Sequence, residues 1–546
     1  MWLKNPETIY FKDIDFSNKS VLKKPPFRIR RCPVIITLAD SHITAVDIQK
    51  LLEAGMNVAK FKMSSSTRGD KIRLLGKIDK AAQACSIKYN VTDWPVASCI
   101  ELKTCVVKTG LLEFDSEFIT LEKNSEVILT YNISYFNKCN AERIFVDNHF
   151  LVNDVTPGTE ISLAADEIIL KCIGIVDDKS IKCVITKGGK LSNLCSVCTR
   201  HAKHSRPFIT KKDTEIIKFA LEYQIDTIII NYVRHPDTIK KIKHLVRALK
   251  IKRPFILCGI CTEEGLVNID EILKETDGLI LSREYLPYEI EKSQQYRLTQ
   301  IQKWVAGKCL QAGKPLYISG GVFEHALKTG HFIDSEISDM TNALMDGVSG
   351  FILKECYNTD IMVDVLKGIN ELCYAIEPLT ISKTNFRRII KEIKMPVNAA
   401  EAAVISCVTA ANQTNSRVII VPTVSGKTIR LLHWLRPSSI VITISTNIRV
   451  LRHLRNYRSV MPILYKGEQH NKWEKNLSAR VLLAVEYAVE KSWLLYGDTY
   501  VILQRGSEFS SFCDAVTIWN VTISNKPLVG CADNEDNPFV SNTYLE

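Results

Sequence analysis

The sequence predicts an α/β protein: a (β/α)8 TIM barrel that is interrupted by a small β-barrel domain and followed by a second α/β domain. Three observations support this fold class. Short apolar runs alternate with amphipathic stretches through residues 31–109 and 208–390, which is the pattern of parallel strands joined by crossover helices. Residues 110–207 contain only strand-like runs parted by turns. The alternation of strands and helices then resumes and continues through residues 391–524.

The clearest repeating unit lies within Pro254–Ile290, where two apolar strands flank a helix. The strands are Phe255–Ile260 and Leu279–Leu281. The helix between them has apolar residues at helical spacing, namely Leu266, Ile269 and Leu273. Ligands of parallel sheets bind at the carboxyl ends of the strands. We therefore expect the functional site near Gly259–Cys261 and Ser282–Tyr285.

The same reading extends to the rest of the barrel. The eight predicted barrel strands are Val34–Leu38, Asn57–Phe61, Val96–Ile100, Thr227–Ile230, Phe255–Ile260, Leu279–Leu281, Leu316–Ser319 and Phe351–Leu353. A helix over Thr44–Ala54 is closed by Gly55 as a left-handed cap, and the last barrel helix covers Asp360–Tyr374. The β insert separates the third strand from its helix.

The C-terminal segment repeats the alternation on a smaller scale. Predicted helices cover Asn398–Asn412, Ser425–Leu435 and Ala479–Leu495, and predicted strands cover Val418–Val421, Ile440–Ile444, Tyr500–Leu503 and Ala515–Trp519. Residues 1–30 and 525–546 are interpreted as tails outside the folded domains.

Composition indicates a globular protein of the cytoplasm. Of the 546 residues, 46% are hydrophobic and 24% charged, and the net charge of +11 is spread along the chain. The 17 cysteines are scattered and no signal peptide is recognised, so we expect reduced thiols. No apolar run reaches the roughly 18 residues of a membrane span, so no membrane contact is predicted.

Local motifs, in order and at family spacing, resemble pyruvate kinases over residues 30–522. They are AGMNVAKFKMSSST from Ala54, FVDNHF from Phe145, GGKL from Gly188, EGLVNIDEILKETDGLILSRE from Glu264, AGKPLYIS from Ala312, TNALMDGVSGFIL from Thr341 and IIVPTVSGKT from Ile419. The resemblance implies phosphoryl transfer from phosphoenolpyruvate to ADP in glycolysis, ATP binding, magnesium and potassium as cofactors, and a tetrameric assembly.

The resemblance also implies which residues should carry the reaction, and most of them are replaced. Gly259 stands at the position of the family's catalytic lysine, and Cys261 and Tyr285 stand at the two metal-binding carboxylates. A thiol and a phenol are poor ligands for magnesium, so metal binding is expected to be weak or absent. Gly320 replaces the family's threonine near the substrate, whereas Arg283 is retained as a substrate-binding residue.

The second and third strands and the end of the eighth carry milder changes. Lys60 stands at the position of the arginine that binds the substrate phosphate, and Ser64 keeps the family's serine. The remaining family positions, three of the potassium site and two after strand eight, fall on Lys62, Glu101, Leu102, Lys354 and Cys356. An ammonium at residue 62 would repel a monovalent cation or take its place.

These replacements predict that the family reaction is absent or residual, because losing one preorganised donor already costs about 10² to 10³ in rate. A structural or regulatory subunit, joined to itself or to an active pyruvate kinase, is the favoured interpretation. Two alternatives remain: an active pyruvate kinase with an atypical site, and a barrel enzyme or sensor for another phosphorylated metabolite. The latter would use Lys60, Lys62, Arg234, Arg283 or Lys354.

The best-preserved ligand motif lies at a strand-to-helix turn of the C-terminal segment. It consists of Thr423, Ser425, Gly426, Lys427 and Thr428. Hydroxyls, backbone N–H groups and a lysine at a helix N-terminus suit a phosphate. In related enzymes the matching loop binds fructose 1,6-bisphosphate, but the companion loop falls on Gly506 and Ser507 where the family has tryptophan and arginine. An ordinary capped turn is the alternative.

Three further patterns favour structural roles. In CSVCTRHAKH the zinc-type side chains Cys195, Cys198, His201 and His204 are too closely spaced for a zinc finger. Cys258 and Cys261 are interpreted as buried thiols on opposite faces of a strand. The basic residues of 240–253 alternate with apolar ones and form a solvated helix face, so nucleic-acid binding is not predicted.

Overall fold

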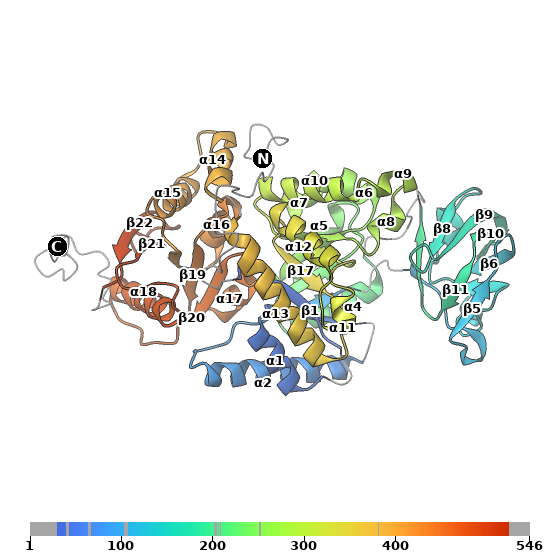
Figure 1. Ribbon diagram of the computed structural model, residues 1–546, viewed down its shortest axis with the longest axis horizontal. Helices are drawn as coiled ribbons and strands as arrows, with labels where there is room; N and C mark the ends of the chain where they lie inside the picture. Colours follow the sequence, from blue (N-terminus) through green and yellow to red (C-terminus); the bar gives the residue numbers. More distant parts are fainter. Residues whose placement is uncertain are drawn as a thin grey trace, which may run out of the picture.

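The computed structural model describes residues 30–39, 43–63, 67–102, 107–200, 205, 207, 209–249, 253–379 and 382–522. Within these residues the chain forms a central barrel with a β domain at one end and an α/β domain at the other (Figure 1). The predicted tails, residues 1–30 and 525–546, lie outside the described part apart from Arg30.

Eight parallel strands close into a barrel, which confirms the predicted fold class. They are β1 (Val34–Thr37), β2 (Val58–Lys62), β3 (Ala97–Glu101), β13 (Thr227–Ile230), β14 (Phe255–Ile260), β15 (Gly278–Ser282), β16 (Leu316–Ser319) and β17 (Gly350–Leu353). Strand β1 closes the ring by pairing with both β2 and β17, with Ile35 beside Val58 and Ile352.

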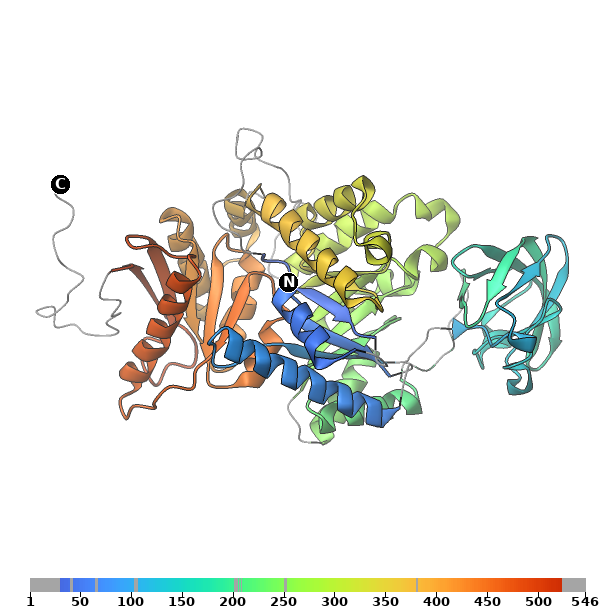
Figure 2. The same cartoon turned by 60° about the horizontal axis from the view of Figure 1, so that its bottom comes forward.

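Helices surround the barrel on its outside. They are α1 (Ala45–Ala54), α2 (Arg68–Lys88), α4 (Lys211–Glu222), α5 (Asp237–Ala248), α6 (Glu263–Val267), α7 (Ile269–Glu275), α8 (Leu286–Glu289), α9 (Lys292–Gln295), α10 (Leu298–Gln311), α11 (Ala326–Thr329), α12 (Asp334–Met345) and α13 (Thr359–Ile376). Helices α1 and α2 pack together beside the first strands (Figure 2).

Local sequence explains how two of these helices begin and end. Thr44 caps α1 through a reciprocal capping box with Asp47, and Gly55 ends the helix at φ 115°, as predicted. The single helix predicted after β14 is instead two helices, because the chain breaks at Asn268, whose side-chain amide donates to the carbonyl of Arg234 at 2.8 Å. Ile269 and Leu273 are buried as expected.

The insert folds around its own apolar core between β3 and α4. Its strands are β4 (Val107–Lys108), β5 (Phe118–Leu121), β6 (Glu126–Thr130), β7 (Arg143–Phe145), β8 (Glu160–Leu163), β9 (Ile168–Asp177), β10 (Ser180–Lys187), β11 (Gly189–Ser192) and β12 (Ser196–Thr199), with one short helix, α3 (Leu151–Asp154). They form a seven-stranded sheet and a two-stranded sheet, so the core is enclosed by two sheets.

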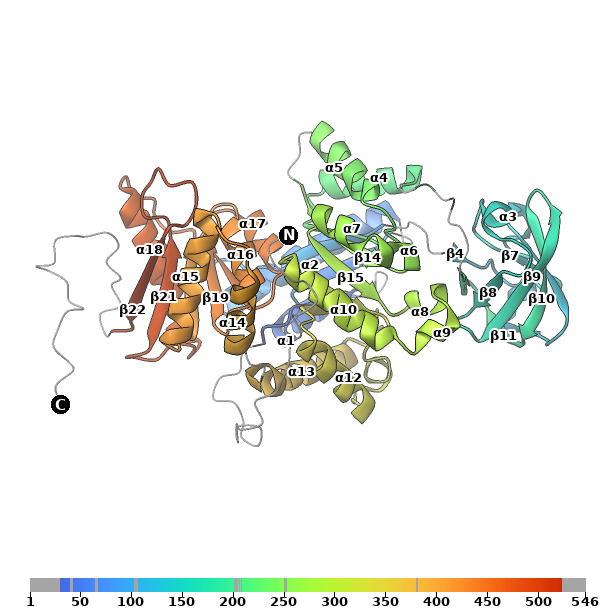
Figure 3. The same ribbon diagram turned by 90° about the horizontal axis from the view of Figure 1, so that it is seen from above.

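Arg200 joins the insert to the barrel. Its buried guanidinium forms ion pairs with Glu160 at 3.0 Å and Asp166 at 2.5 Å within the insert. The same group donates to the backbone carbonyls of Pro287 and Ile290 at 3.3 and 2.7 Å. Those carbonyls belong to α8 and the residue after it, on the side of the barrel that faces the insert (Figure 3).

The C-terminal domain is a five-stranded sheet with helices. Its strands are β18 (Val418–Pro422), β19 (Ile440–Ser445), β20 (Val460–Leu464), β21 (Thr499–Gln504) and β22 (Ala515–Asn520), and its helices are α14 (Ser382–Glu392), α15 (Ala399–Gln413), α16 (Lys427–Leu435), α17 (Ile448–Leu454) and α18 (Trp473–Glu490). The predicted helix Ala479–Leu495 was misplaced, because α18 begins and ends earlier. Three elements, α14, α17 and β20, were not predicted. Strand β20 contains Pro462, a residue that is unusual in strands and therefore obscures the strand pattern in the sequence.

The interior of the barrel packs continuously against the C-terminal domain. Inward-pointing strand residues, among them Ile35, Val58 and Leu257, form one buried cluster with Trp434 and Tyr457. Tyr317 of β16 is fully buried, and its hydroxyl donates to the backbone carbonyl of Asn456 at 2.7 Å. The base of the barrel, the end at which its strands begin, therefore shares one hydrophobic core with the C-terminal domain. No layer of solvent separates the two at this cluster.

We predict that Tyr317→Phe lowers the free energy of unfolding by about 1–3 kcal/mol, because a buried carbonyl loses its only described side-chain donor. The matched change Tyr357→Phe, at a side chain that is 79% exposed, should alter it by less than about 0.5 kcal/mol. Chemical unfolding followed by tryptophan fluorescence measures both. Equal stability of the two variants would contradict the prediction.

Candidate active site

Strand geometry selects the side chains at the carboxyl end of the barrel. Side chains two residues apart on a strand share a face, so the residues that follow the inward layer also point inward. That layer contains Val58, Cys99, Ile229 and Leu257, and the residues two positions later are Lys60, Glu101, Asn231 and Gly259. The barrel therefore brings together three polar side chains and a glycine from four adjacent strands.

Lys60 and Glu101 form a buried ion pair at this end. The ammonium lies 2.6 Å from the Glu101 carboxylate, and the Asn231 side-chain amide donates to the other carboxylate oxygen. Burial alone would lower the pKa of Lys60 and raise that of Glu101. The attraction and hydrogen bond between the two groups outweigh burial, so the pKa of Lys60 is raised and that of Glu101 is lowered.

Asn231 also occupies the space beside Gly259. A Cβ atom at residue 259 would lie 2.4 Å from the Asn231 side-chain oxygen and 3.1 Å from its Cα. Any larger residue at 259 therefore requires the asparagine to move. Glycine at this position and asparagine at 231 fit one another.

Two aromatic residues and a thiol lie next to this group at the carboxyl end of the barrel strands, which we call the mouth. Cys261 is fully buried, and burial raises the pKa of its thiol to about 12. The rings of Tyr232 and Tyr285 lie 5.4 Å apart, and burial followed by the charge of Glu284 raises the pKa of Tyr285. Thiol and phenol are therefore both protonated at neutral pH.

Lysines at the rim are each matched by a carboxylate. Lys62 lies 3.6 Å from Glu355, and Lys354 lies 2.8 Å from Glu324 and 3.7 Å from Glu284. Burial lowers the pKa of Lys354, but these two carboxylates outweigh it and the pKa is raised. The positive charge of the mouth is largely neutralised from within.

Matches to models of known protein families establish the family of this chain. The profile for the barrel domain of pyruvate kinase matches residues 29–357, and the profile for its α/β domain matches residues 401–515. The chain belongs to the pyruvate kinase family.

Several curated pyruvate kinases align over nearly the whole chain. The enzyme from Debaryomyces hansenii is 27% identical over 88% of this chain and 94% of its own length. The enzyme from Schizosaccharomyces pombe is 25% identical over 87% of this chain and 92% of its own length. Human pyruvate kinase PKLR is 23% identical over 91% of this chain and 86% of its own length. Pyruvate kinases are enzymes of glycolysis.

The two residues that the sequence resemblance assigns to the family's metal positions offer poor ligands for magnesium. Magnesium requires anionic or carbonyl oxygens, and Cys261 and Tyr285 offer a protonated thiol and a protonated phenol. Among the described residues, no group of three or more histidine, cysteine, aspartate or glutamate side chains could hold a metal ion. Of the residues that the resemblance assigns to the potassium site, Lys62 pairs with Glu355 and Ser64 lies outside the described residues.

Gly320 and Arg283 are held by neighbours that sequence reasoning did not identify. Gly320 has φ 75°, and a Cβ there would lie 2.4 Å from the Cβ of Glu284, so glycine is required. Arg283 forms a two-pronged ion pair with Asp339 of α12, at 2.5 and 2.9 Å, and bonds Gln302 of α10. These contacts hold its guanidinium among the outer helices.

Two remaining mouth positions have structural contacts. The Cys356 thiol donates to the carbonyls of Leu327 and Asn358 at 3.4 and 3.3 Å. Leu102 is buried, and its backbone N–H bonds the carbonyl of Ile229 at 2.9 Å. Arg234 lies 3.4 Å from Glu264.

The phosphate-type loop of the C-terminal domain is well formed. The Thr423 hydroxyl accepts from the N–H of Gly426, which has φ 75° at the start of α16, and Ser425 and Lys427 are exposed. The Thr428 hydroxyl contacts the thiol of Cys513, at 3.3 Å, and so ties α16 to the loop between β21 and β22.

That second loop contains residues that the sequence interpretation overlooked. The predicted positions, Gly506 and Ser507, bond Asp514 and Ser510. The guanidinium of the preceding residue, Arg505, lies over the Trp473 ring at 5.5 Å. Trp473 begins α18 and lies about thirty residues before the loop in sequence, so the motif at residues 506–507 gives no sign of it.

The prediction that Cys258 and Cys261 are buried thiols is confirmed. The two thiols contact different neighbours: Cys258 contacts Thr276, and Cys261 contacts Ser282. Cys198 is buried and Cys195 bonds Ser192, whereas His201 and His204 lie outside the described residues. None of the described helices is long and apolar enough to cross a lipid bilayer.

The basic helix α5 buries its apolar side. Ile239, Ile242 and Val246 are buried, whereas Leu249, which follows the helix, is 41% exposed. Lys240 and Lys243 pair with Asp237 and Glu275 at 3.4 and 2.6 Å. Lys250 and Lys252 lie outside the described residues.

We predict that Lys60→Met lowers the free energy of unfolding by about 3–5 kcal/mol at pH 8, because it leaves Glu101 buried without its cation. Lys62→Met, at a pair that is more than a third exposed on the lysine side, should cost less than about 1 kcal/mol. Thermal unfolding of both variants measures the difference. The prediction is wrong if the two variants unfold alike.

The pH dependence should also change sign in Lys60→Met. In the native chain the pKa of Glu101 is lowered, so its contribution to stability is present above the unfolded pKa and is lost as pH falls through the folded pKa. Without Lys60, burial is opposed only by the charge of Lys62 and the hydrogen bond from Asn231. We expect burial to raise the pKa of Glu101, so the variant should gain stability relative to the native chain between pH 8 and pH 5. A variant that loses stability over this range would contradict the assignment.

Proposed function

We propose that this member of the pyruvate kinase family is catalytically impaired or inactive and acts in the cytoplasm as a structural or regulatory subunit. The observation that carries the proposal is the closed polar group of Lys60, Glu101 and Asn231. It engages the lysine that would meet the substrate phosphate and occupies the space beside Gly259.

Charge is what the family reaction demands at this place. Phosphoryl transfer depends on positioning and on positive charge against the phosphoryl oxygens. Here Lys60 is bonded to Glu101, and Lys62 and Lys354 are matched by carboxylates at the rim. A phosphate entering the mouth would have to displace those carboxylates, and magnesium would find no anionic oxygen at residues 261 and 285. The same argument supports weak or absent binding of magnesium and potassium.

The proposal includes assembly. Family members are typically oligomeric, and an inactive subunit can regulate an active one through shared interfaces. Native mass spectrometry of the purified chain, alone and mixed with an active pyruvate kinase from the same cells, tests this step. A chain that stays monomeric in both samples would remove the subunit role and leave only the impaired barrel.

We predict no turnover of phosphoenolpyruvate and ADP above background in a coupled lactate dehydrogenase assay. Gly259→Lys, Cys261→Glu and Tyr285→Asp together should also be silent, because Asn231 blocks residue 259. Adding Asn231→Ala should permit Mn²⁺ binding, detected by electron paramagnetic resonance, whether or not activity returns. Wild-type turnover near the 1–100 s⁻¹ that is usual for kinases would refute the proposal.

A second candidate function is binding of a sugar phosphate at the α16 loop. The specific support is the exposed Ser425 and Lys427 above a turn that Thr423 and Gly426 hold open. The neighbouring loop adds Arg505, which is oriented by Trp473 and tied to α16 through Cys513 and Thr428. Anions are favoured at such a helix N-terminus.

We predict that fructose 1,6-bisphosphate binds this loop and that Lys427→Met weakens binding about tenfold, the usual effect of losing one charge-assisted hydrogen bond. Lys475→Met, which removes an exposed lysine on α18, is the matched control and should leave affinity unchanged. Isothermal titration calorimetry measures both. Absence of heat at millimolar bisphosphate would exclude this function.

A further inference from the structure

A cavity of about 490 Å³ lies at the opposite end of the barrel from the mouth. Its barrel wall comes from α5, α7 and α10 and from residues just before β14, β15 and β16, such as Arg253, Asp277 and Lys314. Its other wall is α16 of the C-terminal domain, through Arg430, Leu431 and Trp434. A cavity of this size accommodates a small organic ligand.

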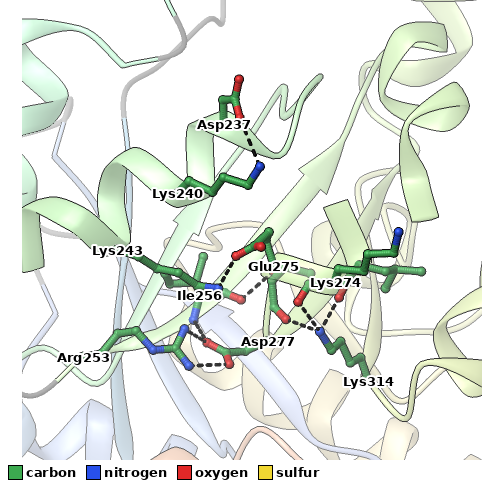
Figure 4. A network of polar contacts seen from close by, with 11 residues as sticks. Asp237, Lys240, Lys243, Arg253, Ile256, Lys274, Glu275, Asp277 and Lys314 are labelled. Carbon is green, nitrogen blue, oxygen red and sulfur yellow. Dashed lines mark hydrogen bonds and ion pairs between the residues drawn. The ribbon is translucent and has the colours of Figure 1, made fainter. Parts of the chain in front are cut away.

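Acidic residues on the barrel wall are each matched to a cation, and Figure 4 shows the pairs of Asp277 and Glu275. Arg253 holds both oxygens of Asp277 at 2.8 Å, and Lys243 holds Glu275 at 2.6 Å. The remaining acid, Asp270, lies 2.9 Å from Lys308. The carboxylates of the wall are therefore already neutralised.

Two cations of the cavity have no carboxylate to match them in the described structure. The Lys314 ammonium donates to backbone carbonyls, including that of Thr276 at 2.7 Å, and burial lowers its pKa. The Arg430 Nε is buried and has no hydrogen-bond partner among the described residues. Six basic and three acidic side chains line the cavity, and a fourth carboxylate, Glu271, pairs with Lys274 at 2.6 Å from outside the lining. Lys314 and Arg430 are thus the two lining cations without a carboxylate partner in the described structure.

The rest of the lining is apolar and flat. Leu273 and Leu431 face the space from opposite domains, and the buried rings of Trp434 and Tyr457 line its floor. Trp434 packs directly on Gly313, where a Cβ would lie 2.9 Å from the tryptophan Cβ. Half-buried cationic groups beside aromatic surface suit a ligand with an anionic head and a flat apolar body.

We propose that this interdomain cavity is a binding site for a small amphipathic organic anion. Its phosphate, sulfonate or carboxylate head would bind Arg430 and Lys314, and its flat apolar body would lie along Leu431 and Trp434. The site is separate from both the barrel mouth and the loop around Lys427. Because its two walls belong to different domains, an occupant would hold the barrel base against α16.

Three probes separate the contributions of head and body in calorimetric titrations of the full chain. They are 1-naphthyl phosphate, inorganic phosphate and 1-naphthol. We expect 1-naphthyl phosphate to bind at one site and each fragment to bind at least about tenfold more weakly, since each lacks one set of contacts. Equal binding of 1-naphthol would show a merely apolar cavity, and no binding of 1-naphthyl phosphate at millimolar concentration would refute the site.

Variants then locate the bound anion. Arg430→Gln should weaken 1-naphthyl phosphate about tenfold through loss of a charge-assisted hydrogen bond. The matched control Lys475→Gln and the loop variant Lys427→Gln should leave affinity unchanged. Ala312→Tyr, at an exposed position where α10 ends, narrows the cavity and should also weaken binding, even if Arg430→Gln does not fold. Unchanged affinity in Ala312→Tyr would overturn the proposal.

Discussion

The ion pair between Lys60 and Glu101 organises the carboxyl end of the barrel. Two opposite charges lie on adjacent strands inside a ring whose lower layers are mostly apolar and carry no charge pair of this kind among the described residues. Taking either charge out of water is costly, so neither is tolerated there without the other. The pair also fixes Asn231, which completes the bonding of Glu101 and in turn determines what can stand at residue 259. A lysine on one strand thus constrains the chemistry available on two others.

The replacements at the mouth depend on one another. Gly259 fits because Asn231 fills the space beside it, and Gly320 fits because Glu284 approaches its backbone. A side chain added at either position would conflict sterically with that neighbour. We interpret the mouth as a tightly packed surface whose charges are largely neutralised by their own neighbours.

Charge is distributed differently at the two ends of the barrel. At the mouth, the rim lysines form ion pairs with Glu324, Glu284 and Glu355. At the base, Lys314 donates to backbone carbonyls, and the Nε of Arg430 has no hydrogen-bond partner among the described residues. The base also shares its core with the C-terminal domain, through Tyr317 and Trp434. Ligand recognition at the base and at the α16 loop would both act on the same helix.

The sequence by itself determined the fold class, the strands of the barrel and the family. Apolar runs of strand length, the Thr44 cap and the Gly55 stop are local signals, and they are read correctly without tertiary contacts. The sequence also located the mouth, because strand ends are its known position in such barrels.

Only the tertiary structure decided which side chains meet there. Asn231, Glu284 and Glu355 reach the mouth from strands or loops far from their partners in sequence, and no periodicity marks them. The resemblance assigns Arg283 to the substrate, and only the structure shows that its guanidinium pairs with Asp339 of α12. Pairing between buried groups is set by the closure of the barrel, which a one-dimensional pattern does not contain.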